Sequence, residues 1–278
     1  MALTLLVEEF AYQLNAKVGD GLHYYDRGLV SREAITVIPL SDLHVGHPQA
    51  RLKALEAVIQ RIKEDPQCYT VLIGDLAETA TKESKGDTYT TWNPQKEVEW
   101  LIEHFRPIKD KILGVVPGNH EWRIWRQDGT DIVKLFSLAL DLPKGCYAQD
   151  SLIVKVNVGE RANGKPIPYL LYLHHGSGGG KTTGKWQRAR ELNGLVDNAD
   201  VYCTGHVHDP AIFPSVRRWV DTRNGKLIEA TRWNVINASW IPDAEYGERF
   251  GLPPGLTHVW EIRLGSDKRA IKIAGETF

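Results

Sequence analysis

The chain has 278 residues, 42% of them hydrophobic and 25% charged, a composition that fits a globular protein and excludes a disordered, collagen-like or coiled-coil chain. Thirty-four Lys and Arg against 35 Asp and Glu give a formal net charge of −1. This value argues against a protein that coats nucleic acid with a basic surface all round, but it is compatible with a local basic face. Three cysteines are too few for a disulfide framework or a thiolate zinc site, and they suit a reducing compartment.

The first residues carry apolar side chains at helical spacing. Leu3, Leu6, Phe10 and Leu14 predict a short amphipathic helix that packs on the body of the protein. The segment lacks the basic start of a secretion signal, and no apolar run reaches the roughly 20 residues of a membrane-spanning helix. We therefore expect a cytoplasmic protein with no membrane partner and no obligate protein partner.

From residue 34 the chain alternates between strand-like and helix-like patterns. Apolar runs predict strands over 34–40, 70–73 and 111–116, and apolar residues at helical spacing predict helices over about 52–62, 98–105 and 131–142. The polar stretch 78–93 predicts a loop or lid. This alternation is typical of βαβ units in an α/β fold.

After residue 150 the predicted elements are mostly strands. They cover 152–158, 169–173, 200–204, 257–264 and 269–273. Two sheets packed face to face with helices outside would fit one domain of this size. We expect a single domain, 1–278, with an N-terminal helix and lead-in (1–33), a core (34–208) and C-terminal strands (209–278).

Five predicted strands end in polar residues of a narrow type. These groups are Asp42-Leu43-His44, Gly74-Asp75, Gly118-Asn119-His120, His174-His175-Gly176 and Gly205-His206-Val207-His208. Each group alone is weak, because Asp-x-His is common by chance and Gly-Asp or Gly-Asn is most often a turn. Together, carboxylates, imidazoles and an amide oxygen are the ligands that a pair of borderline divalent cations takes. The set therefore predicts a metal site at the strand ends.

In this order the groups resemble the calcineurin-like metallophosphoesterase family, whose pattern reads D-x-H, G-D, G-N-H-[DE], H and G-H-x-H. Glu121 completes the third element, so that every element is present between about 34 and 208, the expected metal-binding core. The glycine-rich run 176–180 is similar to that of phage and bacterial stand-alone members. The resemblance implies a four-layer α/β/β/α metallophosphoesterase sandwich with two mixed β-sheets.

The resemblance also implies the metal ligands. They are Asp42, His44 and His208 for the first ion, Asp75 for both ions, and Asn119, His206 and either His175 or His174 for the second. Family members with a single His before Gly favour His175, and members with a His-His pair followed by Pro favour His174. Because side chains alternate along a strand, only one of the two can face the metals, and we expect His175.

The mechanism implied by the resemblance uses two divalent ions. Mn²⁺ is expected, with Fe, Zn or Ni as alternatives, because the ligands are nitrogen and oxygen atoms without thiolates. A hydroxide that bridges the two ions, both of them held by the catalytic Asp75, would attack phosphorus. His120 would protonate the leaving group; the alternative is that His120 only fixes Asp42 or Asn119.

Substrate contacts are less defined by the sequence. Arg123 lies close enough to His120 in sequence to reach a phosphate oxygen, and Glu78 either orients a ligand or is solvated in the loop. Lys181, in a glycine-rich and basic stretch, would cradle a phosphate, or the stretch would track a polynucleotide with Trp186 as a stacking surface. The alternative without a functional role is that this stretch is a flexible loop leading into a solvated helix.

These observations predict a metal-dependent phosphoesterase, acting on phosphodi- or phosphomonoesters of nucleotides or nucleic acid. One alternative is a phosphoprotein phosphatase, which the missing arginine after Gly74-Asp75 disfavours. The other is a non-catalytic metal-binding scaffold, which the complete ligand set disfavours.

Overall fold

The computed structural model describes residues 22–81, 84, 92–161, 163–178, 184–242 and 255–278. The predicted N-terminal helix, Lys181 and most of the predicted loop 78–93 lie outside the described residues. No helix in the described part is long and apolar enough to cross a membrane.

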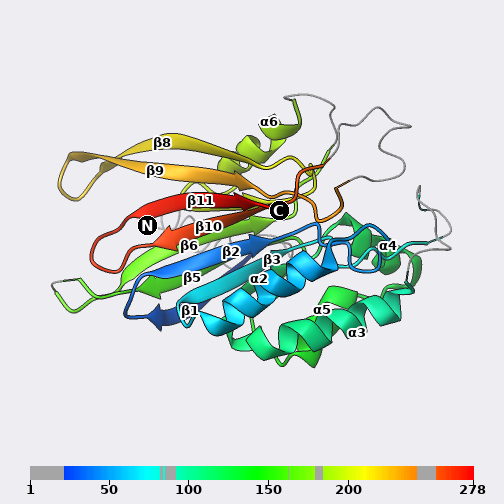
Figure 1. Cartoon of the computed structure of the whole chain (residues 1–278). Helices are drawn as coiled ribbons and strands as arrows, with labels where there is room; N and C mark the ends of the chain where they lie inside the picture. The colour runs from blue at the N-terminus through cyan, green and yellow to red at the C-terminus, as the bar shows by residue number, and fades with distance from the viewer. Residues whose placement is uncertain (1–21, 82–83, 85–91, 162, 179–183, 243–254) are drawn as a thin grey trace, which may run out of the picture.

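One sheet has five strands in the order β11-β10-β2-β3-β4 (Figure 1). They are β2 (Ile35–Leu40), β3 (Cys68–Ile73), β4 (Ile112–Val116), β10 (His258–Leu264) and β11 (Ile271–Thr277). Strands β2, β3 and β4 run parallel, whereas β10 is antiparallel to both β2 and β11. The carboxyl ends of β2, β3 and β4 therefore meet at one edge of the sheet.

The other sheet has six strands in the order β1-β5-β6-β7-β9-β8. They are β1 (Leu22–Ser31), β5 (Ser151–Val158), β6 (Ile167–His174), β7 (Val201–Thr204), β8 (Ala211–Asp221) and β9 (Lys226–Ile236). Parallel and antiparallel pairs alternate irregularly, so that this sheet is mixed as well.

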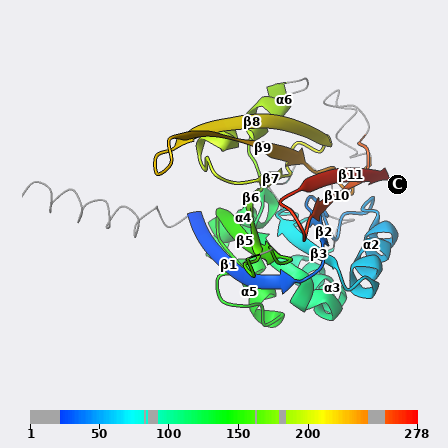
Figure 2. The same cartoon turned by 90° about the vertical axis from the view of Figure 1, so that its left-hand side faces the viewer.

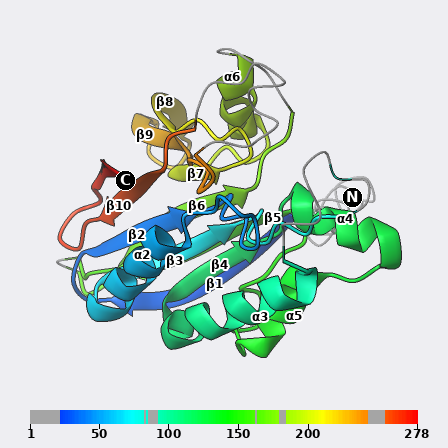
Figure 3. The same ribbon diagram turned by 45° about the vertical axis from the view of Figure 1, so that its right-hand side comes forward.

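Helices cover both outer faces of the pair of sheets (Figures 2 and 3). The helices are α2 (Leu52–Glu64), α3 (Pro94–Phe105), η1 (Arg106–Lys111), α4 (Asn119–Asp128), α5 (Ile132–Ala139), α6 (Gly184–Glu191) and η2 (Leu192–Gly194). Apolar residues of α2, α3 and α5 share a core with the five-stranded sheet, and η2 packs on the six-stranded sheet. The predicted α/β fold with two mixed sheets between helical layers is confirmed.

Two elements differ from the sequence-based expectation. Strand β1 lies inside the expected lead-in 1–33, where exposed Tyr24 and Leu29 and two register shifts hide the alternation of an ordinary strand. Helix α4 begins at Asn119, where a strand-end loop was expected, so that Asn119 and His120 form its first turn. The domain limits 1–278 stay a prediction.

The two sheets pack closely at Gly114 in β4. A Cβ atom at this position would lie 2.7 Å from Val154 Cγ2, 2.9 Å from Leu173 Cδ1 and 3.0 Å from Leu152 Cδ2, all in the other sheet. These contacts are shorter than van der Waals distance, so that a side chain here would push the sheets apart.

We predict that Gly114→Ala lowers the free energy of unfolding by about 1 kcal/mol or more. The energetic cost of overpacking exceeds the stabilisation that alanine gives by reducing the backbone entropy of the unfolded chain. Urea denaturation followed by circular dichroism measures the change. The matched control is Gly184→Ala, because Gly184 begins α6 and a Cβ there would meet nothing within 4 Å. Equal stability of Gly114→Ala and the wild-type protein would contradict the close packing of the sheets at this point.

Candidate metal centre

Loops from both sheets meet at one end of the molecule. Asp42 follows β2, Asp75 follows β3 and Asn119 follows β4, whereas His175 and His206 follow β6 and β7 of the other sheet. Backbone hydrogen bonds join these loops: the Asp42 N–H donates to the Gly74 carbonyl at 3.0 Å and the Gly205 N–H donates to the His175 carbonyl at 2.9 Å. The sheet packing therefore brings together residues that lie far apart in the sequence.

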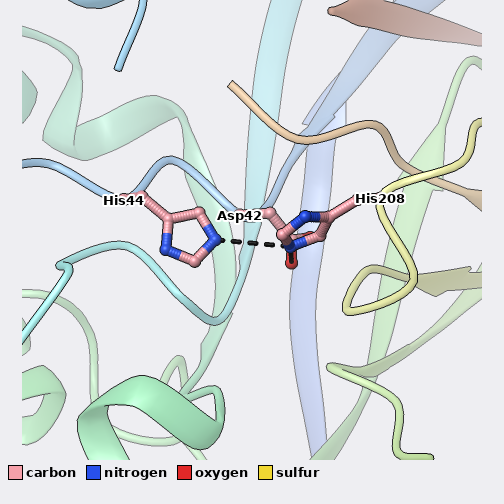
Figure 4. Close-up of side chains that lie close together, drawn as sticks. All are labelled: Asp42, His44 and His208. Carbon is pink, nitrogen blue, oxygen red and sulfur yellow. Dashed lines mark hydrogen bonds and ion pairs between the residues drawn. The ribbon is translucent and has the colours of Figure 1, made fainter. Parts of the chain in front are cut away.

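A first cluster consists of Asp42, His44 and His208 (Figure 4). His208 Nε2 lies 3.1 Å from Asp42 Oδ1 and 3.4 Å from His44 Nε2. Asp42 and His44 are at most 1% exposed. Three potential ligand atoms thus converge at a place that is buried at Asp42 and His44 and open to solvent at His208, whose side chain is 33% exposed.

A second cluster consists of Asp75, His175 and His206. His175 Nε2 lies 3.2 Å from Asp75 Oδ2 and 3.1 Å from Asn119 Oδ1. His206 Nδ1 lies 2.6 Å from the same Asn119 oxygen. The predicted ligands on four different loops are therefore within reach of one point.

The ring nitrogens that face away from the clusters fix the tautomers of two histidines. His175 Nδ1 lies 2.8 Å from the Ile73 carbonyl, and His206 Nε2 lies 2.7 Å from the Gly178 carbonyl. A carbonyl oxygen only accepts, so both nitrogens donate, and the opposite ring nitrogen of each neutral imidazole presents a lone pair to Asn119 Oδ1, itself an acceptor. Lone pairs that face one another need a cation or a proton between them, and this donor set fits divalent ions.

The predicted ligands also share an unusual backbone conformation. Five of the seven non-glycine residues with positive φ in the described part are predicted ligands: Asp42 (52°), His44 (49°), Asp75 (50°), His206 (70°) and His208 (56°). Left-handed conformations of such residues cost about 1–3 kcal/mol each and cluster at functional sites. The fold therefore tolerates strain at the positions where the side chains converge.

Charge at the centre shifts several pKa values. Burial raises the pKa of Asp75, but the neighbouring His175 and His120 outweigh burial and hold it well below its usual range. Burial lowers the pKa of His175, but Asp75 and Asp42 raise it to about 10. The pKa of His208 is raised as well, because its contact with Asp42 outweighs burial. In the metal-free protein, protons on His175 and His208 thus supply the positive charge that metal ions would otherwise supply.

His120 stands at the start of α4 beside both clusters. Its backbone N–H donates to Asp75 Oδ1 at 2.8 Å, and its Nδ1 donates to the Glu78 carbonyl at 2.8 Å. Its Nε2 lies 3.8 Å from Asp75 Oδ2 and accepts from Arg123 Nη2 at 2.8 Å. The ring is therefore fixed with Nε2 toward the centre, and burial lowers its pKa.

Glu78 lies between the two histidines of this part of the centre. Its Oε2 is 2.9 Å from His44 Nδ1 and 3.5 Å from His120 Nδ1. The carboxylate thus accepts a hydrogen bond from His44 Nδ1, so that His44 Nε2 is directed to the first cluster. Of the two readings of Glu78 from the sequence, its contacts match the orienting one.

Two supporting carboxyl groups received no role from the sequence. Glu121 accepts hydrogen bonds from four backbone N–H groups around Asp75, those of Asp75, Leu76, Ala77 and Gly118. Glu97 is fully buried on α3 and accepts from the Thr79 N–H at 2.8 Å; burial raises its pKa to about 8. Glu97, Leu101 and Phe105 are spaced four residues apart and so share one face of the helix. A charged residue on this otherwise apolar face was the sequence feature that could have indicated a structural role for Glu97.

Not every predicted residue lies at the centre. His174 is on the other face of β6, where its Nδ1 accepts from the Gly176 N–H at 2.8 Å. The contacts described above thus involve His175, the expected one of the pair. Arg123 lies at His120, whereas Trp186 packs against Phe213 with ring centroids 6.0 Å apart. Lys181 lies outside the described residues.

The family model for calcineurin-like phosphoesterase matches residues 35–210. No curated protein sequence matches the chain.

Solved structures that are similar to the chain include the following three. A predicted phosphoesterase from Streptococcus pneumoniae TIGR4 is 13% identical with a TM-score of 0.40, covering 88% of this chain and 90% of that chain. Vps29 of Chaetomium thermophilum is 12% identical with a TM-score of 0.39, covering 88% and 99%. GAP50 of Plasmodium, the anchor in the inner membrane complex, is 10% identical with a TM-score of 0.39, covering 88% and 89%.

We predict that cation binding releases protons. Below pH 10 the metal-free His175 is protonated, so that a cation must displace this proton, and the affinity rises about tenfold per pH unit for each proton released until the pH passes the raised pKa. Calorimetric titration with Mn²⁺ in buffers of different ionisation enthalpy counts the protons.

The matched pair for this measurement is His175→Gln and His174→Gln. The first variant should release about one proton fewer, whereas the second should match the wild-type protein, because burial lowers the pKa of His174 and leaves it neutral. The same proton count for all three proteins would remove His175 from the centre.

Proposed function

The chain belongs to the calcineurin-like phosphoesterase family, and on this premise we propose that it hydrolyses phosphodi- or phosphomonoesters with two divalent metal ions held at the ends of the strands. The observation that carries the proposal is the pair of side-chain clusters, Asp42-His44-His208 and Asp75-His175-His206, in each of which the potential ligand atoms lie within 4.8 Å of one another. This donor set matches the ligands of borderline divalent cations.

The proposed ligands of the first ion are Asp42, His44 and His208, and those of the second are His175, His206 and Asn119. Asp75 would help to hold both ions, as the family's ligand pattern implies; its Oδ2 lies 3.2 Å from His175 Nε2. When bound, the two ions would polarise the phosphate and lower the pKa of a shared water, making hydroxide available near neutral pH. Mn²⁺ is the proposed metal, with Fe, Zn or Ni as alternatives.

His120 is the proposed general acid. Because Nδ1 donates to the Glu78 carbonyl, Nε2 is the atom that faces the centre. Once Arg123 has turned away from Nε2 and this nitrogen has taken up a proton, the imidazolium would pass that proton to the leaving oxygen. Burial lowers the pKa of His120 and favours release of this proton, whereas the Glu78 side chain, 3.5 Å from Nδ1, favours the positive charge on the ring.

Arg123 is the proposed contact for the substrate phosphate. Its guanidinium group reaches the centre from α4 and lies 2.8 Å from His120 Nε2. A phosphate anion would attract this group more strongly than a neutral imidazole does. Arg123 would then turn from His120 to a phosphate oxygen.

The proposed substrates are phosphate esters of nucleotides or nucleic acid, and the proposed location is the cytoplasm. Cys68, Cys146 and Cys203 are all free and buried, which suits a reducing compartment.

We predict that His120→Asn keeps its metals but loses about 10²–10⁴-fold in turnover of esters with poor leaving groups, the usual range for general acid catalysis. The loss should be far smaller for p-nitrophenyl esters, whose leaving group needs no proton. Metal content by mass spectrometry and steady-state rates on both ester types measure the effect. An equal loss on both types would contradict the acid role of His120.

A Mn²⁺-supplemented substrate panel tests the whole proposal, with Asp75→Ala as the inactive control. The panel contains bis-p-nitrophenyl phosphate, p-nitrophenyl phosphate, 2′,3′-cyclic nucleotides and single-stranded DNA. Turnover that Asp75→Ala lacks would support a phosphoesterase. Absence of turnover with every substrate would favour a non-catalytic scaffold.

We further predict that Arg123→Gln raises KM about tenfold for a dianionic monoester and less for a monoanionic diester, because the lost guanidinium charge matters more to the higher charge. Arg126→Gln is the matched control, because Arg126 lies on the same helix with an exposed side chain. If both variants keep the wild-type KM, Arg123 does not bind the substrate.

A further inference from the structure

Arginines and aromatic rings cover one side of α6 and the facing side of β8 and β9. We call this surface the α6–β8 strip; it consists of Trp186, Arg190, Phe213, Arg217, Trp219 and Arg232. All six side chains are at least partly exposed. Figures 1 and 2 show α6 beside the β8–β9 hairpin.

The rings and the guanidinium groups of the strip lie against one another. Phe213, Arg217 and Trp219 alternate along β8 and so point to the same face. The Arg190 guanidinium lies 5.5 Å from the Phe213 ring, and the Arg217 guanidinium lies 4.3 Å from the Trp219 ring. Each arginine thus lies within cation–π distance of a ring whose side chain is still partly exposed.

Positive charge is concentrated in this part of the chain. Segments 184–191 and 211–236 contain eight basic and three acidic residues, although the whole chain has a formal net charge of −1. Asp197 pairs with Arg217 at 2.9 Å and with Arg232 at 3.2 Å. One carboxylate holds these two guanidinium groups side by side and neutralises only one of their charges.

The strip begins next to the metal centre. The side chain of Arg188 in α6 lies against Gly178, where a Cβ atom would be 2.8 Å from Arg188 Cδ. The carbonyl of the same Gly178 accepts from His206 Nε2. An open hollow lies between α6 and β8, lined by Gly184, Trp186, Gln187, Arg190, Glu191 and Phe213. From Phe213 to Trp219 the strand extends about 20 Å farther, enough for several nucleotides.

We propose that the α6–β8 strip binds a single-stranded polynucleotide and presents one of its phosphodiester bonds to the metal centre, an inference that rests on the proposed function. The open parts of the rings would stack on unpaired bases, and the arginines beside them would contact the phosphates between those bases. A duplex hides its base faces, and an acidic peptide uses the charges but has no flat surface for the rings. The alternation of rings and cations therefore favours a single strand.

Binding is tested with the full-length, Mn²⁺-loaded protein and a fluorescein-labelled phosphorothioate oligothymidylate, which keeps bases and charge but resists hydrolysis. Fluorescence anisotropy should show that Phe213→Ala and Trp219→Ala each weaken binding about tenfold or more. Arg217→Gln should also weaken binding and reduce the slope of log K against log salt by about 0.7, the value for one lost phosphate contact on a single strand.

The matched control is Arg218→Gln, the neighbour of Arg217 on the same strand. Its side chain points to the opposite face and pairs with Glu229 at 2.8 Å. The same change of charge should leave oligothymidylate binding as in the wild-type protein. If the Arg217 and Arg218 variants weaken oligothymidylate binding equally, binding depends on the total charge and not on the α6–β8 strip, and the proposal is overturned.

Competition distinguishes the possible ligands of the strip. Inorganic polyphosphate or polyglutamate that displaces the oligothymidylate equally from the wild-type protein and from Trp219→Ala would overturn the proposal in favour of a charge-only ligand or an acidic protein. Turnover of bis-p-nitrophenyl phosphate, which is too small to reach the strip, should be unchanged in every strip variant. If the wild-type protein lacks this turnover but the strip variants still lose oligothymidylate binding, the proposed hydrolysis fails and the binding surface stands.

Discussion

The centre is organised by the need to neutralise electron pairs that converge in a buried space. Asp42 and Asp75 are almost fully buried, and the carbonyls of Ile73 and Gly178 hold His175 and His206 so that their lone pairs also point inward. Leaving a buried charge unpaired is costly, so the arrangement is stable only with positive charge at its middle. In the metal-free protein that charge is protons on histidine, and divalent ions would supply it in the holoenzyme.

The surrounding fold holds these side chains in place against strain and repulsion. Glu121 fastens the backbone from Asp75 to Ala77 to the start of α4 through its hydrogen bonds. Because the two sheets share a tightly packed core, the loops at their ends cannot drift apart without opening it. Precise geometry at the centre therefore depends on packing between the sheets, far from any ligand.

The parts of the structure that could be predicted from the sequence are those with a local signal. Buried parallel strands such as β3 show as continuous apolar runs, and the polar groups after them mark the site. Strand β1 has no such signal, because it lies at a sheet edge and is interrupted by bulges. The roles of Glu97 and Glu121 could not be predicted, because their partners are backbone N–H groups, and a sequence does not show which backbone groups a fold leaves without a partner.

Net charge illustrates a second limit of sequence reasoning. A sum over the whole chain contains no spatial information, so a value near zero is compatible with a strongly basic surface. Along β8, the adjacent Arg217 and Arg218 point to opposite faces: one lies beside Trp219 on the side of α6, and the other pairs with Glu229. Identical neighbours in the sequence thus have different physical surroundings, and only the face on which a charge lies decides whether it can contribute to binding.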